Sequence, residues 1–221
     1  VFLALKVVYA NLIGLLCRET ENCDGWRVME VVGLDPRIGR SHILPGIPYG
    51  GPCLVKHTLA FGRFMLEKTG LDFVKRIHDY NELVIEKFVE YLDSVLDGLQ
   101  GRKIAVLGVS YTPGSPVVKD SPAMKLCEKL LSKNAIVYIH DVNREAVEKA
   151  KAVLSRVIAF ETMERLKEVD AVIVTLGYDE YRLIPPDLYD NVLVIDMTGV
   201  VIYEKAHRFY TSSTRKTRSL S

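Results

Sequence analysis

From residue 102 onward, short apolar stretches alternate with amphipathic ones, and this alternation restricts the fold more than any other feature of the sequence. The apolar stretches are typical of strands and cover residues 103–109, 135–141, 157–160, 171–176 and 192–197. Helical patterns separate them, at residues 121–133, 144–154 and near 161–167. Alternation at this spacing predicts a parallel sheet with right-handed crossovers, and the apolar strands predict burial on both faces. We therefore expect a Rossmann-like, doubly wound α/β domain, in which ligands bind beyond the carboxyl ends of the strands.

Residues 1–98 have a different texture, because helical segments follow one another there without strands between them. The helical segments are residues 2–19, 24–32, 54–68 and 71–98. The last has an apolar stripe at three-to-four spacing, made of Leu71, Val74, Ile77, Asn81, Val84, Ile85, Phe88, Leu92, Val95, Leu96 and Leu99. A helix of about 28 residues spans about 40 Å, which is long enough to link two domains. We predict a helical dimerisation region over 1–98, a Rossmann-like domain over 99–210 and a mobile basic tail over 211–221.

Composition and charge restrict the class of partner. The net charge is +1, which favours neither nucleic acid nor a membrane surface. Residues 1–17 are apolar but too short for a membrane span, and Lys6 and Asn11 interrupt them, so we expect a core helix. The four cysteines include no CxxC pair and the five histidines are scattered, so we expect no metal site. We expect reduced thiols and a cytoplasmic location.

The stretch "GIPYGGPCLVKH", residues 46–57, is the first candidate for chemistry. Its glycines allow positive φ angles and close approach to a ligand, while its prolines stiffen the backbone. Cys53 stands at the start of an apolar helix, close to Lys56, where the helix dipole and the lysine would favour a thiolate. The alternative is a tight turn that carries a small buried thiol. We call residues 46–53 the glycine loop.

The stretch "GVSYTPGSPVVKDSP" follows the first predicted strand and lacks the GxGxxG pattern of a dinucleotide site. We therefore expect no NAD site here. Phosphate could still bind, because a helix capped by Ser121 would offer free N–H groups and Lys119 lies just before it. The alternative is a long loop without a ligand.

Taken together, several stretches of this chain resemble the UDP-glucose/GDP-mannose (nucleotide-sugar 6-) dehydrogenases. The stretches, in chain order, are "LALKVVYANLIGLL", "DPRIG", "PYGGPCLVK" and "KIAVLGVSYTPGSPVVKDSPAMKL". Members of that family have an N-terminal NAD-binding domain, a central helical dimerisation region and a C-terminal domain that binds the UDP-sugar. The resemblance covers the second and third parts. It implies the C-terminal portion of an NAD-dependent enzyme that oxidises a sugar CH2OH to a carboxylate through a cysteine thioester.

The resemblance also assigns roles to residues. Cys53 matches the nucleophile that attacks the 6-aldehyde. Lys56 matches the lysine of the family, and His57 replaces an aspartate that handles water and a proton, a role that histidine can also fill. Arg37 matches an arginine that reaches the nucleotide sugar of a dimer partner. The expected substrate-binding residues are Arg37, His42, Tyr49, Gly50, Gly51 and Lys119.

The chain departs from the family pattern at several positions. Thr112 and Thr198 stand where the family has a lysine and an arginine, and Pro116 and Val117 replace two aspartates. The catalytic lysine and asparagine, the glutamate that assists hydrolysis and the NAD domain would lie before Val1. We therefore expect the chain alone to be inactive, with a UDP-sugar as ligand, a homodimer through residues 1–98, and either an upstream NAD domain or a separate chain that carries it.

Two other hypotheses remain open at this point. A non-catalytic nucleotide-sugar-binding or dimerisation module would explain the changes at His57, Thr112 and Thr198. A stand-alone NAD-binding regulator is disfavoured by the missing glycine fingerprint. If Cys53 is an activated nucleophile, it should be the most reactive of the four thiols, with Cys23 as its competitor.

Overall fold

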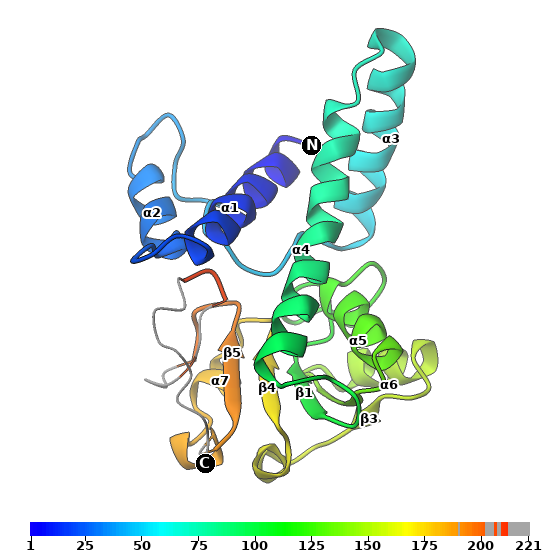
Figure 1. The fold of residues 1–221 in the computed structure, drawn as a ribbon. Coiled ribbons are helices and arrows are strands. Elements are labelled where there is room, and N and C mark those ends of the chain that lie inside the picture. The colour runs from blue at the N-terminus through cyan, green and yellow to red at the C-terminus, as the bar shows by residue number, and fades with distance from the viewer. Residues whose placement is uncertain (190, 202–205, 207–208, 212–221) are drawn as a thin grey trace.

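The computed structural model describes residues 1–189, 191–201, 206 and 209–211, and it consists of a helical half joined to an α/β half (Figure 1). The helical half contains α1 (Phe2–Arg18), α2 (Gly25–Val32), α3 (Pro52–Thr69) and α4 (Phe73–Val95). These are the helices expected from the sequence, with ends that differ by a few residues. The predicted mobile tail lies outside the described residues, apart from Thr211.

The α/β half is built on a five-stranded parallel sheet with the order β3-β2-β1-β4-β5. The strands are β1 (Lys103–Leu107), β2 (Ile136–His140), β3 (Ile158–Ala159), β4 (Ala171–Val174) and β5 (Leu193–Asp196). Every pair is parallel, because each strand returns through a crossover of the kind that the alternating sequence predicts. The Rossmann-like, doubly wound fold is therefore confirmed.

The two faces of the sheet are covered by different elements, as the alternation of side chains along each strand requires. On one face, Ile104 and Val106 pack with α4, α5 (Pro122–Ser132) and α6 (Arg144–Val153). On the other, Ala105 and Leu107 pack with the 3₁₀ helices η1 (Met163–Glu168) and η2 (Pro186–Tyr189) and with α7 (Asp179–Arg182). The helix expected near 161–167 is thus a 3₁₀ helix.

Helix α4 joins the two halves, as its predicted length suggested. Its predicted stripe is largely correct: Val84, Phe88 and Leu92 are buried in the same core as the sheet. Leu71 is 60% exposed, because the helix begins only at Phe73. Ion pairs fasten α4 to α5, with Nζ–Oε1 distances of 2.6 Å for Lys125–Glu82 and 3.0 Å for Lys129–Glu86.

Helix α1 is a core helix, as predicted, and buries Ala4, Val8 and Ala10. None of the helices in the described part of the chain is both long and apolar enough to cross a membrane.

The C-terminal segment packs back onto the helical half. Tyr210 is 1% exposed, its ring lies against Gly14, and its hydroxyl donates to the Gly46 carbonyl at 2.6 Å. Its own carbonyl accepts from Gly25 N at 3.0 Å. The guanidinium of Arg18 lies over the neighbouring Phe209 ring, 4.8 Å from its centroid. Residues 209–210 therefore pack against the second half of α1, the start of α2 and the glycine loop.

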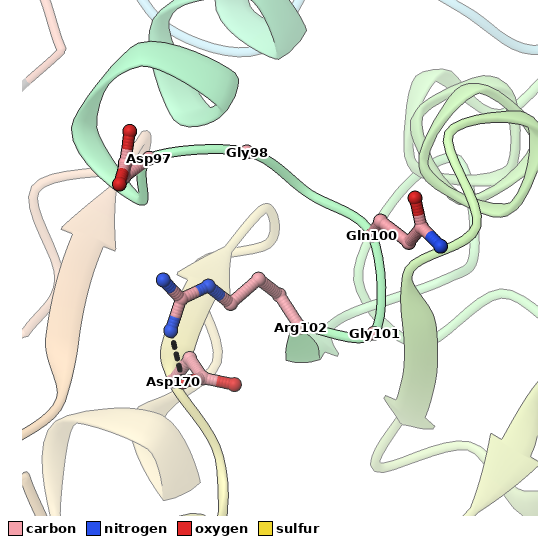
Figure 2. Close-up of a pocket in the computed structure, with 6 residues that line it drawn as sticks. All are labelled: Asp97, Gly98, Gln100, Gly101, Arg102 and Asp170. Atoms are coloured by element: carbon pink, nitrogen blue, oxygen red, sulfur yellow. Dashed lines mark hydrogen bonds and ion pairs between the residues drawn. The ribbon is translucent and has the colours of Figure 1, made fainter.

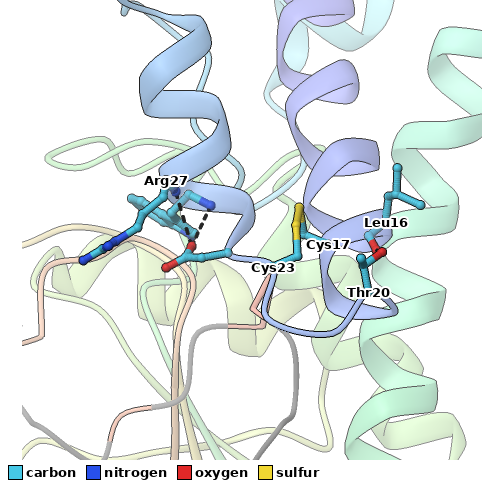
Figure 3. The surroundings of a disulfide bond; sticks show 7 residues. Leu16, Cys17, Thr20, Cys23 and Arg27 are labelled. Carbon is cyan, nitrogen blue, oxygen red and sulfur yellow. Dashed lines mark hydrogen bonds between the residues drawn. A yellow bond between two sulfur atoms is a disulfide. The ribbon is translucent and has the colours of Figure 1, made fainter.

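A disulfide joins Cys17, at the end of α1, to Cys23, just before α2 (Figure 3). The expectation of four reduced thiols is therefore wrong. The connection between the helices turns back at Asn22, where φ is 57°, and it brings the two Cα atoms within 4.7 Å, which is within the range for a disulfide. The argument for a cytoplasmic location from cysteine usage loses its support, and Cys23 is no competitor of Cys53.

Candidate functional site

The glycine loop leads directly into α3, and Cys53 lies in the first turn of that helix. Pro52 occupies the first helical position, where its missing N–H costs nothing, so the helix begins two residues earlier than predicted. Cys53 is an exposed free thiol, whereas Cys127 is free and buried. The alternative of a small buried thiol at position 53 is therefore wrong.

Buried polar side chains hold the glycine loop at Gly46 and at Tyr49. Asn11 of α1 accepts from Gly46 N through Oδ1 at 2.8 Å, and Tyr210 donates to the carbonyl of the same residue. Asn81 of α4 holds the backbone of Tyr49 on both sides, accepting from its N–H at 2.9 Å and donating to its carbonyl at 3.0 Å. Both asparagines are at most 1% exposed. The loop is thus positioned by three separate segments.

The second half of the glycine loop packs on the turn between β1 and α5, residues 108–121. Gly51, at φ 83°, donates its N–H to the Asp120 carbonyl at 2.9 Å. A Cβ at Gly51 would overlap the ring of Tyr111, and one at Gly50 would come within 2.5 Å of the Asp120 carbonyl oxygen. Glycine is needed at both positions, because the backbones approach too closely for a side chain. The two motifs found in the sequence therefore meet at one place.

The other predicted catalytic residues lie on α3. Cys53, Lys56 and His57 are three and four positions apart, which places them on one face of the helix. All three are exposed, and within the described part of the chain neither Lys56 nor His57 makes a hydrogen bond or ion pair. Their side chains are therefore available to a ligand.

The predicted substrate-binding residues fall into two groups. Tyr49, Gly50 and Gly51 are in the glycine loop, and the exposed Lys119 directly precedes Asp120, to which the loop is bonded. The structure brings these four together. Arg37 and His42 are exposed, and within the described residues neither forms a hydrogen bond or ion pair with the loop.

Arg37 is instead paired within its own segment. Its side chain is 87% exposed and its guanidinium bonds Asp35, with an Nη2–Oδ2 distance of 2.6 Å. That hydrogen bond is the main reason that the pKa of Asp35 is lowered and that of Arg37 is raised. A side chain so exposed could reach a second chain.

The carboxyl edge of the sheet is closed by Asp141, which follows β2 and is 3% exposed. One carboxylate oxygen accepts from Val109 N at 2.8 Å and from the N–H and Oγ of Ser110, both at 2.9 Å. The other accepts from Asn143 N at 2.9 Å and from the Tyr178 hydroxyl at 3.0 Å. An acidic residue at the end of the second strand is the usual partner of the NAD ribose. Here it is fully engaged by the protein, and the GxGxxG turn is also missing, so the residues of this sheet do not fit NAD.

The positions that depart from the family pattern support loops. Thr198 donates from Oγ1 to Asp196 at 2.8 Å, in a turn after β5, and the Thr112 carbonyl accepts from Ser110 Oγ at 3.2 Å. The first turn of α5 is buried, with Gly50 lying against Pro122. The glycine loop therefore covers the helix end at which a phosphate was expected to bind. Of the groups expected to bind phosphate, the exposed Lys119 is the one that stays accessible.

A surface hollow of about 550 Å³ lies away from the candidate site (Figure 2). It surrounds the ion pair of Arg102 and Asp170, whose Nη1–Oδ1 distance is 3.2 Å. Asp170 directly precedes β4 and Arg102 precedes β1, so the hollow is at the amino ends of the strands, the opposite edge from the glycine loop. It is not part of the candidate site.

Sequence reasoning missed the residues that position the loop. Asn11 and Asn81 were visible as polar residues inside apolar stretches, and buried polar groups are nearly always hydrogen-bonded. That signal indicates a buried bond without indicating its partner. Tyr210 carried no signal, because its contact with Gly46 spans 164 residues.

Comparison with known proteins identifies the family. The model of the central domain of the UDP-glucose/GDP-mannose dehydrogenase family matches residues 1–83, and the model of its UDP-binding domain matches residues 105–203. The chain is 30% identical over 210 residues to a UDP-glucose 6-dehydrogenase of Rickettsia prowazekii (strain Madrid E), covering 90% of this chain and 48% of that protein. It is 29% identical over 206 residues to the putative UDP-glucose 6-dehydrogenase YtcA of Bacillus subtilis (strain 168), covering 90% and 47%.

A solved structure agrees with these matches. The UDP-glucose dehydrogenase from the hyperthermophilic archaeon Pyrobaculum islandicum superposes with a TM-score of 0.86 at 36% identity, over 96% of this chain and 49% of that one. The chain thus spans about half the length of the curated relatives it matches. Because two domain models of one family match successive parts of the sequence, the chain belongs to the UDP-glucose/GDP-mannose dehydrogenase family and covers its central and UDP-binding domains.

Proposed function

We propose that this chain forms the thiol-bearing and UDP-sugar-binding part of a nucleotide-sugar 6-dehydrogenase of the UDP-glucose type. The observation that carries the proposal is the packing of the glycine loop on the turn between β1 and α5. The Gly51 N–H bonds the Asp120 carbonyl, so the exposed Cys53 stands next to the carboxyl edge of the sheet. Ligands of doubly wound sheets bind at that edge.

The chemistry assigned to Cys53 is covalent catalysis. Its thiolate adds to C6 of a sugar aldehyde, an S–C bond forms, and the carbonyl oxygen takes a proton. Loss of a hydride from C6 and of the hydroxyl proton from the adduct then gives a thioester, and attack by water releases the carboxylate and restores the thiol. His57, on the same helix face as Cys53, is the proposed base for that water.

Hydride removal requires a nicotinamide acceptor. Since the residues of this sheet do not fit NAD, the proposal places the cofactor in a domain outside these 221 residues. In this proposal the chain alone binds a UDP-sugar but does not produce NADH.

We also propose that the chain forms a homodimer through residues 1–98. Large apolar side chains are exposed on all four helices of that region, and large exposed apolar patches often mark interfaces between proteins. Examples are Phe2, Tyr9, Val31, Phe61, Phe64 and Phe73. In such a dimer the exposed Arg37 would reach the partner's sugar nucleotide. Light scattering at micromolar concentration tests this, and a monomer would contradict it.

The experiment for the main proposal combines binding with thiol protection. Calorimetry should show binding of UDP and UDP-glucose, and Lys119→Ala should weaken it about tenfold, since a charge-assisted bond to phosphate is lost. Lys68→Ala is the control, because this lysine lies at the far end of α3. UDP-glucose should also slow alkylation of Cys53 by iodoacetamide.

The outcomes separate the two candidate functions. If neither UDP nor UDP-glucose binds at millimolar concentration, the proposal is wrong. If UDP-glucose binds without protecting Cys53, the non-catalytic nucleotide-sugar-binding module is favoured, as the replacement at His57 would allow.

A further inference from the structure

One turn of α4 carries three polar side chains, two of which bond the glycine loop. His78, Asn81 and Glu82 are three and four positions apart and so share a helix face. Asn81 holds the backbone of Tyr49, and His78 Nδ1 lies 3.0 Å from the hydroxyl of the same tyrosine. Glu82 bonds Lys125 of α5 at 2.6 Å. The backbone and the side chain of Tyr49 are therefore held by neighbouring residues of α4.

The direction of the Tyr49–His78 bond follows from the two groups. Burial raises the pKa of Tyr49 to about 12, so the hydroxyl keeps its proton near neutral pH. A neutral His78 accepts a hydrogen bond from that hydroxyl at Nδ1 and carries its own hydrogen on Nε2, which lies 4.0 Å from Glu82. A protonated imidazole has no acceptor nitrogen, so once His78 is charged the bond can persist only in the reverse direction, with Nδ1–H donating to the Tyr49 oxygen.

We propose that neutral His78 is a positioning residue for Cys53, which it holds in place through the hydroxyl of Tyr49. Tyr49 is followed in the loop by Gly50 and Gly51, which contact the sheet turn, and then by the first turn of α3. Securing Tyr49 secures the start of α3, where the helix dipole acts on the Cys53 thiol. The role in catalysis rests on the function proposed above, but the positioning itself does not.

The charged groups around His78 come from each element that packs on it. Asp79 and Glu82 lie on α4, Lys125 on α5, and Asp120 in the turn that receives the loop. Burial has the largest influence and lowers the pKa of His78, Glu82 opposes it, and Lys125 adds to it. The neutral form that accepts from Tyr49 is thus favoured near neutral pH.

The test measures the alkylation of Cys53 by iodoacetamide between pH 5 and pH 8 in the folded chain. Cys17 and Cys23 are in a disulfide and Cys127 is buried, so the rate reports on Cys53. Tyr49→Phe keeps the ring and removes the hydroxyl. We expect it to react about two- to fivefold more slowly than wild type at pH 8, the size of a helix-dipole effect. The ratio of the two rates should change over the pH range in which His78 takes up a proton, because its bond to Tyr49 then reverses direction.

Two further variants distinguish a specific role from a structural one. Glutamine can accept from Tyr49 at any pH, so His78→Gln should retain the rate at pH 8, and the ratio of its rate to that of Tyr49→Phe should not change with pH. His140→Gln is the matched control. His140 lies on β2 and also bonds a tyrosine hydroxyl, that of Tyr181, at 3.1 Å. This variant should leave the pH profile of Cys53 unchanged.

A ratio of the wild-type alkylation rate to the Tyr49→Phe rate that is constant with pH would overturn the proposal. So would the loss, in His140→Gln, of the pH dependence that wild type shows. If Tyr49→Phe fails to fold, the comparison of wild type with His78→Gln decides alone, and identical profiles overturn the proposal. The assay needs neither a sugar nucleotide nor NAD. A chain that bound no UDP-sugar would refute the proposed function and still give a result for His78.

Discussion

The close contact between the glycine loop and the sheet turn can be tested at Gly51. Its backbone, at φ 83° and ψ 157°, is in a region that is essentially restricted to glycine. Its Cα also lies so close to the ring of Tyr111 that a methyl group would overlap it. Gly51→Ala therefore adds two separate costs, backbone strain and steric overlap, which suitable partner variants can separate.

The magnitude follows from these two terms. Backbone strain of this kind costs about 1–3 kcal/mol, and an extra methyl in a packed site costs about 1–3 kcal/mol. The sum lowers the free energy of unfolding by about 2–6 kcal/mol. Gly39→Ala is the control, because Gly39 also has a positive φ, of 73°, and no atom lies within 4 Å of the point where its methyl group would be. It should cost only about 1 kcal/mol.

Urea unfolding of four variants separates the terms: Gly51→Ala, Tyr111→Ala, the double variant and Gly39→Ala. Removing the Tyr111 ring should relieve the overlap, so the double variant should be about 1–3 kcal/mol more stable than additivity predicts. Additivity within about 0.5 kcal/mol would show that no overlap exists. A cost at Gly51 equal to that at Gly39 would refute the whole argument.

Three other predictions follow from single observations. Substoichiometric iodoacetamide at pH 7 should modify Cys53 and leave the buried Cys127 untouched, which peptide mapping by mass spectrometry can measure. Labelling of Cys127 before Cys53 would contradict the assigned exposure of the two thiols. Tyr210→Phe leaves the Gly46 carbonyl without its hydroxyl donor and should lower the free energy of unfolding in urea by about 1–3 kcal/mol, whereas an unchanged midpoint would show that the C-terminal segment does not dock. Burial lowers the pKa values of His78 and His140 in the folded chain below their ordinary value of 6.5, so on acidification the unfolded chain takes up these protons at a higher pH than the folded chain does. The free energy of unfolding should therefore be highest above about pH 6.5 and should decrease as the pH falls toward the folded-state pKa values. A urea midpoint that does not change between pH 5 and pH 8 would contradict this.

The sheet could be predicted from the sequence because its physical requirement is local and repeated. Each buried parallel strand must be apolar on both faces and must be followed by a crossover, and both properties are visible in the order of residues. The same reasoning placed Cys53 at a helix start, since Pro52 and the glycines before it restrict the backbone there. These features depend on neighbours in the sequence.

The contacts that build the site depend on residues far apart in the sequence, which no periodicity reveals. Asn81 interrupts an apolar stripe and so indicates a buried hydrogen bond, but its partner Tyr49 is 32 residues away. The disulfide between Cys17 and Cys23 depends on the positive φ of Asn22, which turns the chain back. A spacing of six residues alone does not distinguish this geometry from an open loop.

The anchors of the glycine loop also bear on the choice between a catalytic part and a module for dimerisation alone. Burying an amide is costly unless it is hydrogen-bonded, and the buried amide of Asn81 bonds the Tyr49 backbone through both its oxygen and its nitrogen. Buried hydrogen bonds of this kind make a structure rigid, yet the residue to which the loop leads, Cys53, is exposed. A thiol that must bond a sugar carbon and then release it needs both a fixed position and open access. Surface helices that only join two chains need neither, so the combination supports the covalent role proposed for Cys53.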